Sequence, residues 1–165
     1  SKMLLNAALE TGLPVWVGLS CCDSKFDNSV IGRNFRAEKE KSLIYDENKY
    51  RDQPKYLPED KIILLEDIIK SLMSLGGDVY GIMHTWFQDS ISGLKILKNN
   101  WKGPIMFYPE IHKFDTNTHK AIITMTEEEF SNSILELIDD QIQIVGGCCG
   151  VNDKHLKRLI QSISE

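Results

Sequence analysis

Near its C-terminus the chain reads Val145-Gly146-Gly147-Cys148-Cys149-Gly150, with two adjacent cysteines enclosed by glycines. A short apolar run precedes this stretch, and a segment with helical periodicity follows it. Neighbouring side chains of a β-strand point to opposite faces, so a regular strand cannot aim both thiols at one ion. The backbone must therefore turn here, and glycine tolerates the conformations that such a turn requires. The pattern indicates a pair of thiols at the end of a buried strand.

Two thiols alone are one ligand short of a zinc site. Zinc binds thiolates well, and its catalytic sites combine three protein ligands with one open position. The two-residue spacing between cysteines that is usual in zinc sites is absent here. From these residues alone, the pair is also compatible with two small buried hydrophobic side chains or with a strained disulfide.

Short apolar runs alternate with segments of helical periodicity, which predicts parallel strands separated by helices. We expect strands at 14–20, 79–83, 104–108 (closed by Pro109) and 142–145, and helices at 3–10, 58–75, 91–100, 127–138 and after Asn152. Residues 23–57 form a long polar segment, which is expected to be a loop or lid over a site, or else a solvated insertion.

Residues able to bind metal ions follow each predicted strand: Cys21 and Cys22, then His84, then Glu110 and His112, then Cys148 and Cys149. The carboxyl ends of parallel strands meet at one edge of the sheet, where the active sites of such folds lie. We therefore expect a metal site at this edge, with His84 as the third ligand beside Cys148 and Cys149. His112 is a weaker candidate.

The amino-acid composition limits the classes of protein to which this chain can belong. The 165 residues have the length of one domain, and 42% hydrophobic with 26% charged residues indicates a folded core. The net charge of -5 argues against nucleic acid and anionic membranes as partners and favours a small molecule. The apolar runs are too short for a transmembrane helix. Four cysteines in adjacent pairs do not form the pattern of a secreted disulfide scaffold, so we expect a cytoplasmic location.

The stretch Gly146 to Gly150, followed by His155, resembles the C-terminal motif of the homocysteine S-methyltransferases, and Leu13 to Val17 and Tyr108-Pro109 are similar to later strands of that family. The resemblance implies that residues 1–165 are part of a single barrel domain. They would form the C-terminal half, about strands five to eight, of a (β/α)8 TIM barrel. Four βα units cannot close such a barrel. The missing half is then expected from the same longer chain or from another chain, which could be a second copy in a homo-oligomer. The alternative fold is an open doubly wound domain.

The same family has a zinc-binding cysteine in a Gly-x-Asn-Cys sequence, where this chain reads Gly81-Ile82-Met83-His84. The resemblance implies a zinc cofactor held by His84, Cys148 and Cys149. It implies a methyltransferase of methionine biosynthesis, which moves a methyl group from an activated donor to a thiol such as homocysteine. Zinc would hold the acceptor as the nucleophilic thiolate. The alternatives are a degenerate, non-catalytic barrel module with a binding or regulatory role and, less favoured, a thiol redox site at the cysteine pair.

The remaining candidates have weaker roles. Trp86 and Phe87 could form a cation–π wall for a cationic methyl donor, or could pack the first turn of a helix. We expect Cys21 and Cys22 to serve packing or to line the pocket. His119 and His155 are expected at the surface.

Overall fold

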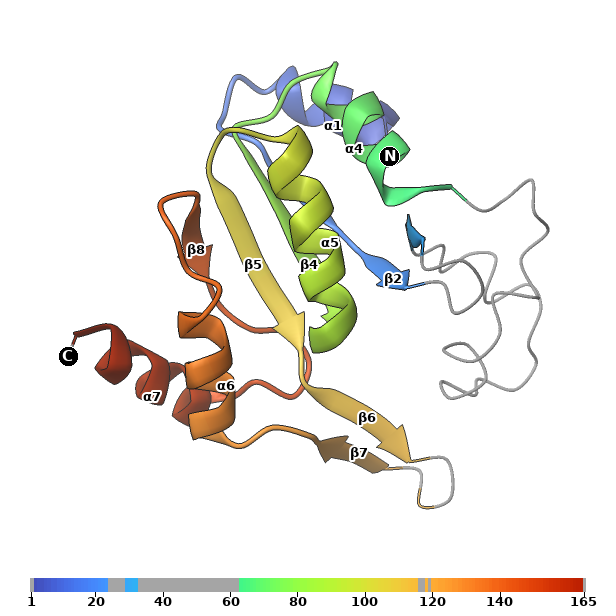
Figure 1. Cartoon of the computed structure of the whole chain (residues 1–165). Coiled ribbons are helices and arrows are strands. Elements are labelled where there is room, and N and C mark those ends of the chain that lie inside the picture. The colour runs from blue at the N-terminus through green and yellow to red at the C-terminus, as the bar shows by residue number, and fades with distance from the viewer. Residues whose placement is uncertain (1, 24–28, 33–62, 116–117, 119, 165) are drawn as a thin grey trace.

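Four parallel strands form the central sheet of the computed structural model, which describes residues 2–23, 29–32, 63–115, 118 and 120–164. In sheet order they are β1 (Trp16–Leu19), β4 (Val79–Trp86), β5 (Ile105–Glu110) and β8 (Ile142–Val145) (Figure 1). Neighbours in the sheet follow one another along the chain, so the sheet grows in one direction. This confirms the predicted α/β class with a parallel sheet.

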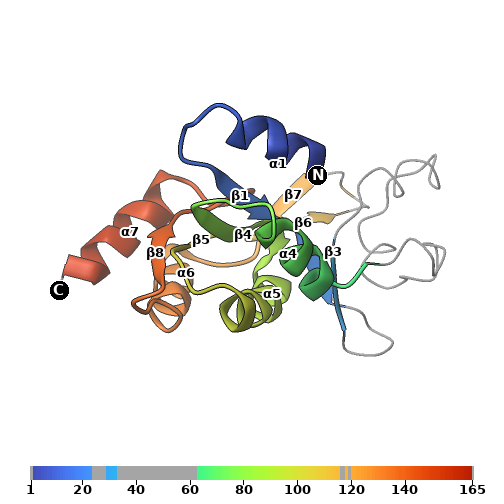
Figure 2. The same ribbon diagram turned by 90° about the horizontal axis from the view of Figure 1, so that it is seen from above.

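Helices cover one side of this sheet. The described helices are α1 (Lys2–Leu9), α4 (Leu65–Met73), α5 (Phe87–Asn100), α6 (Glu127–Leu135) and α7 (Asp153–Ser164). Figure 2 shows α4, α5 and α6 on the same side. Phe87 at the start of α5 packs edge-on against Phe107 of β5 and Phe130 of α6, with ring centroids 6.2 and 6.4 Å apart. All three rings are buried, so they join the sheet to two helices in one core.

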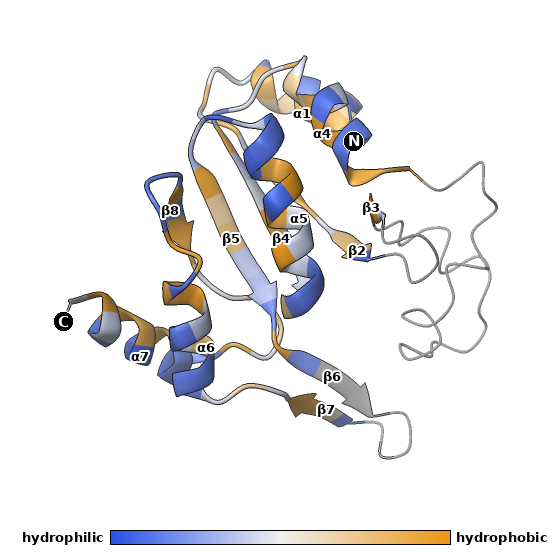
Figure 3. Cartoon of the chain, viewed as in Figure 1, coloured by the Kyte–Doolittle hydropathy of each residue, from blue (hydrophilic) through white to orange (hydrophobic). Residues whose placement is uncertain are grey.

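The edge strand β1 is exposed on one of its faces. Along β1, Leu19 is buried, whereas Trp16 and Gly18, which alternate with it, are exposed. Figure 3 shows hydrophobic stretches in α1 and α7, where the exposed apolar side chains are Met3, Leu4, Ile160 and Ile163. Parallel sheets are normally covered on both faces. An exposed edge strand together with exposed apolar side chains on α1 and α7 is consistent with part of a barrel-like fold.

Helix α4 begins later than expected, so the predicted start at Pro58 is wrong. Leu64 has extended backbone angles and forms an antiparallel bridge with Ile31, and Gly32 N–H donates to the carbonyl of Ile63 at 2.9 Å. Pairing with this strand segment holds residues 63–64 out of the helix. Residues 58–62 lie outside the described part of the chain.

Two antiparallel strand pairs were not predicted. The first pairs β2 (Cys21–Asp23) with β3 (Val30–Gly32) at the start of the expected loop, and the rest of that loop, 24–28 and 33–57, lies outside the described residues. The second pairs β6 (His112–Asp115) with β7 (Lys120–Ile123) and projects from the end of β5 (Figure 1). Strand β5 also continues through Pro109, contrary to prediction. None of the helices in the described ranges is long and apolar enough to cross a membrane.

Two glycines opposite each other in adjacent strands provide a matched test of the sheet packing. Gly18 of β1 pairs with Gly81 of β4. A methyl group at Gly81 would collide with the backbone carbonyl of Met106 in β5, and would lie 2.7 Å from the Cβ of that residue. At Gly18 it would meet only the flexible thioether of Met83.

We therefore expect Gly81→Ala to lower the free energy of unfolding by about 2–3 kcal/mol, because the strand backbone must move. Gly18→Ala should cost less than about 1 kcal/mol, because a thioether can rotate away. Urea denaturation of both variants and the wild type measures the difference. Equal losses would contradict this account of the packing between β4 and β5.

Candidate metal centre

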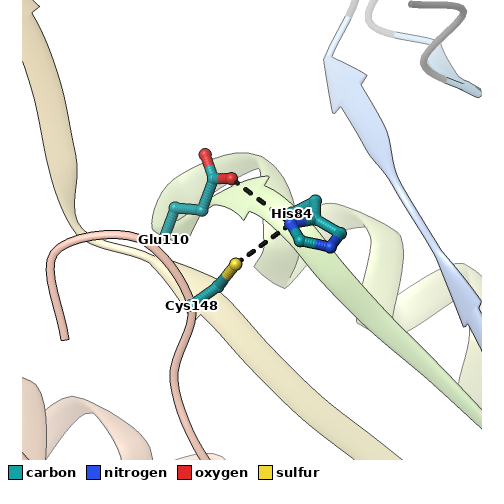
Figure 4. Close-up of side chains that lie close together, drawn as sticks. All are labelled: His84, Glu110 and Cys148. Atoms are coloured by element: carbon teal, nitrogen blue, oxygen red, sulfur yellow. Dashed lines mark hydrogen bonds and ion pairs between the residues drawn. The ribbon is translucent and has the colours of Figure 1, made fainter. Parts of the chain in front are cut away.

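Three side chains converge at the carboxyl edge of the sheet. His84 comes from β4, Glu110 from β5 and Cys148 from the loop after β8 (Figure 4). Nδ1 of His84 lies 3.0 Å from Sγ of Cys148 and 3.9 Å from Oε1 of Glu110. The three ligand atoms all lie within 4.8 Å of one another. This is the edge at which the sequence predicts a metal site.

Hydrogen bonds to the end of β5 position the cysteine loop. The N–H of Cys148 donates to the carbonyl of Pro109 at 3.0 Å, and the N–H of Ile111 donates to the carbonyl of Cys149 at 2.9 Å. Gly150 then turns the chain with a φ of 92°, which glycine adopts without strain. The predicted backbone turn at the cysteine pair is confirmed.

A local irregularity of β4 presents His84. Its φ is 51°, a left-handed conformation that costs a non-glycine residue about 1–2 kcal/mol. The hydroxyls of Ser20 and Thr85 both donate to the carbonyl of Met83 at 2.9 Å, and Thr85 also accepts from the N–H of Cys21 at 3.0 Å. Buried and partly buried hydrogen bonds to Met83 and Thr85 thus support the strained backbone on either side of His84.

The structure brings together two of the three predicted ligands and adds another candidate. His84 and Cys148 are in contact, as expected. Cys149 is exposed, and its Sγ lies 4.0 Å from that of Cys148. Glu110, which the sequence places among the possible metal-binding residues at the strand ends but not among the expected ligands, lies in the cluster instead. Its position directly after Tyr108-Pro109 places it at the correct edge of the sheet, but the register of β5 against β4 is what brings it beside His84.

The thiol of Cys149 is hard to ionise in the absence of a cation. Partial desolvation raises its pKa to about 11, and the nearby Cys148 and Glu110 add to the shift because they disfavour another negative charge. A bound divalent ion would oppose these effects, since metal binding replaces the proton of a thiol. The raised pKa of Cys149 thus reflects first the partial burial of its thiol and then the neighbouring Cys148 and Glu110.

The converging donor atoms suit zinc. Imidazole nitrogen, carboxylate oxygen and thiolate sulfur are its usual protein ligands, and tetrahedral bonds of about 2.0–2.3 Å place ligand atoms roughly 3.3–3.8 Å apart. The distances from His84 Nδ1, 3.0 and 3.9 Å, lie on either side of this range. Three protein ligands would leave a fourth position for a substrate.

Two other predictions concern residues that prove to pack in the core. Cys21 is only 1% exposed, burial raises its thiol pKa to about 12, and its Sγ lies 3.7 Å from the carbonyl of Asp89. This confirms a packing role. Phe87 is also buried among aromatic rings, so it is not part of a cation–π wall.

The expectation that His155 lies at the surface is wrong. Its side chain is 2% exposed and packs edge-on against Phe130 of α6, with ring centroids 5.7 Å apart. Its Nε2 lies 3.2 Å from the carbonyl of Met125, which precedes α6. The N–H of His155 also donates to the side chain of Asn152, which caps α7 as predicted. His155 therefore ties the start of α7 to α6.

One of the other two histidines is described, and it lies outside the cluster. His112, the weaker ligand candidate, is not part of the converging group, and its buried Nδ1 has no hydrogen-bond partner among the described residues. His119 lies outside the described residues.

Comparison with known proteins identifies the family. The family model for homocysteine S-methyltransferase matches residues 64–163, which is more than half of the chain. The match includes His84, Glu110 and the cysteine pair, whereas the similarity at residues 13–17 lies outside it. No curated protein matches the chain. The family's name describes methyl transfer to a thiol sulfur. The chain belongs to the homocysteine S-methyltransferase family.

Proposed function

We propose that this chain is part of a zinc-dependent methyltransferase, which moves a methyl group from an activated donor to a small thiol such as homocysteine and so produces methionine. The observation that chiefly supports this proposal is the 3.0 Å contact between His84 Nδ1 and Cys148 Sγ, within the part of the chain that matches the family. Nitrogen and sulfur ligands from two separate strand ends are suited to a zinc centre.

His84 and Cys148 would hold the metal in this proposal. Cys149, the third ligand expected from the sequence, adjoins Cys148, while Oε1 of Glu110 lies 3.9 Å from the same Nδ1 of His84 that Cys148 contacts. Bound zinc would supply a Lewis acid that lowers the pKa of an acceptor thiol toward neutrality. The side chain of His84 is 52% exposed, so a small thiol can reach this position from outside the sheet.

The proposed reaction is a nucleophilic displacement at a methyl carbon. The acceptor thiol loses its proton to solvent, and an electron pair of its sulfur forms the new bond to the methyl carbon. The bond between that carbon and the donor breaks, and its electron pair remains on the donor. Methyl donors whose leaving group readily accepts this electron pair include a sulfonium, a quaternary ammonium and a methylated corrinoid.

The proposed protein is an eight-stranded barrel, of which this chain supplies the C-terminal half. Support comes from the strand order, from the edge strands β1 and β8, and from the exposed side of β1 that carries Trp16. Eight parallel strands close such a barrel, and its active site lies at the carboxyl edge. The remaining strands, from the same longer chain or from another chain, would contribute the groups that recognise the rest of the acceptor and donor.

We expect the purified full-length protein to bind about one zinc ion per chain, because a catalytic zinc site needs three protein ligands. His84→Ala and Cys148→Ala should each abolish or strongly weaken binding, and both should remove methyl transfer to homocysteine. His112→Ala is the matched control, since His112 lies near the same edge but outside the cluster. Metal analysis after gel filtration measures the stoichiometry.

The outcomes separate the competing functions. Zinc binding that persists in His84→Ala would show that another residue is the ligand, and His112 would be the next residue to test. A wild-type protein that binds no zinc after metal-free purification and reloading would contradict the proposed zinc centre, and would favour a non-catalytic module. Formation of a Cys148–Cys149 disulfide under mild oxidation would support the redox alternative.

A further prediction concerns the exposed apolar side of α7. Without its complementary half, the isolated 165-residue chain should self-associate at micromolar concentrations through Ile160 and Ile163. Ile160→Lys with Ile163→Lys should raise the dissociation constant by about tenfold or more, because the variant loses buried apolar area. Light scattering across a concentration series measures this.

Gln161→Lys with Ser164→Lys is the matched control, because it adds the same charge at exposed polar positions of the same helix. The control should associate like the wild type. A wild-type chain that stays monomeric throughout the series would contradict the expected self-association through Ile160 and Ile163.

A further inference from the structure

We propose that Glu110 is the third protein ligand of the metal centre, beside His84 and Cys148. The centre then has one nitrogen, one oxygen and one sulfur ligand, with Cys149 beside it rather than in it. This inference rests on the metal centre of the proposed function and changes one of its ligands.

The first argument is the position of Glu110 in the sheet. Its strand, β5, lies between β4, which carries His84, and β8, which leads to Cys148. Glu110 pairs in register with Trp86 of β4, just past the histidine turn. On the other side, the N–H of Cys148 is bonded to Pro109, the residue before Glu110. The carboxylate thus projects from the middle of the three segments that form the cluster (Figure 4).

The second argument is the convergence of ligand atoms. Oε1 of Glu110 belongs to the set of three atoms that lie within 4.8 Å of one another, whereas Sγ of Cys149 does not join that set. The Sγ of Cys149 lies 4.0 Å from that of Cys148. An ion bound to His84 and Cys148 would therefore reach Glu110 with a smaller rearrangement than it would need to reach Cys149.

The third argument is the burial of a charge. The side chain of Glu110 is only 12% exposed, and a carboxylate in such a place needs a positive partner. Among the residues that the structure describes, its only ion-pair contact is with His84, at a long 3.9 Å. A divalent cation between these side chains and Cys148 would supply the missing charge.

The geometry also argues against a cysteine nucleophile activated by a histidine and a carboxylate. In such a triad the nucleophile and the carboxylate contact opposite nitrogens of the imidazole, so that a proton can be taken at one and orientation fixed at the other. Here Cys148 and Glu110 both approach Nδ1 of His84. Donor atoms that surround one point are the arrangement of ligands around an ion.

A mixed ligand set has a consequence for metal choice. Thiolate-rich sites favour soft ions, whereas carboxylate and imidazole favour borderline and harder ions. With Glu110 in place of Cys149 the centre should discriminate less strongly for cadmium over zinc. Glu110→Cys should raise the preference for cadmium, because it adds a thiolate at the same position.

The test uses the full-length protein and its metal content rather than its activity. Zinc and cobalt(II) affinities are measured by competition with a chelator for the wild type, Glu110→Gln and Cys149→Ser. Glu110→Gln should weaken zinc binding by about tenfold or more, and Cys149→Ser by less than about threefold. Glu136→Gln, the same exchange at an exposed site on the end of α6, should change affinity by less than about twofold.

X-ray absorption at the zinc edge of the wild type provides a measurement that needs no variant. One sulfur with nitrogen and oxygen neighbours supports the assignment, whereas two sulfurs would overturn it in favour of Cys149. Unchanged zinc affinity in Glu110→Gln would also overturn it, while leaving the zinc centre itself intact. A wild-type protein without zinc overturns the proposed function as well, so the two failures are distinguishable.

Discussion

Backbone hydrogen bonding to β5 fixes the geometry on both sides of the candidate metal centre. On one side, β5 pairs with β4 up to the register Trp86 to Glu110, which brings the histidine turn beside the carboxylate. On the other, the carbonyls of Phe107 and Pro109 accept from Gly146 and Cys148, so the loop after β8 stays attached to the strand after regular pairing ends. The site therefore depends on the end of one central strand, and any slip in its register would separate all three ligand atoms.

The left-handed conformation of His84 is the local cost of this arrangement. A straight strand would place His84 in the ordinary alternation between the two faces of the sheet. The register of β4 against β5 shifts between Met83 and Trp86, and it does so where Ser20 and Thr85 bond the carbonyl of Met83. Strain that neighbouring hydrogen bonds hold in place is typical of functional positions. Here the strained residue is the one that contacts Cys148.

The sequence predicts the elements whose signals are local and misses those that depend on distant segments. Strand β8, the start of α6 at Glu127 and the turn at the cysteine pair follow from short patterns, and all three are present. The late start of α4 depends on pairing with Ile31, which no local pattern encodes. His155 reads as a polar helix residue, yet it is buried because α6 packs over it. Glu110 enters the site because register places it there, which a strand-end position alone does not determine.

The net charge of the proposed ligand set would affect the reactivity of a thiol bound to the metal. Three thiolates around a divalent zinc ion sum to one negative charge, whereas one histidine, one carboxylate and one thiolate leave the centre neutral. A less negative centre withdraws more charge from an acceptor sulfur, which lowers the pKa of the thiol and also lowers the nucleophilicity of the thiolate. The two effects oppose each other. The ionised fraction of the acceptor thiol stops rising appreciably once the pKa of that thiol falls below the ambient pH. Beyond that point only a more reactive methyl donor could maintain the rate, so in the proposed methyltransferase a histidine ligand at His84 would bear as much on the donor as on the acceptor.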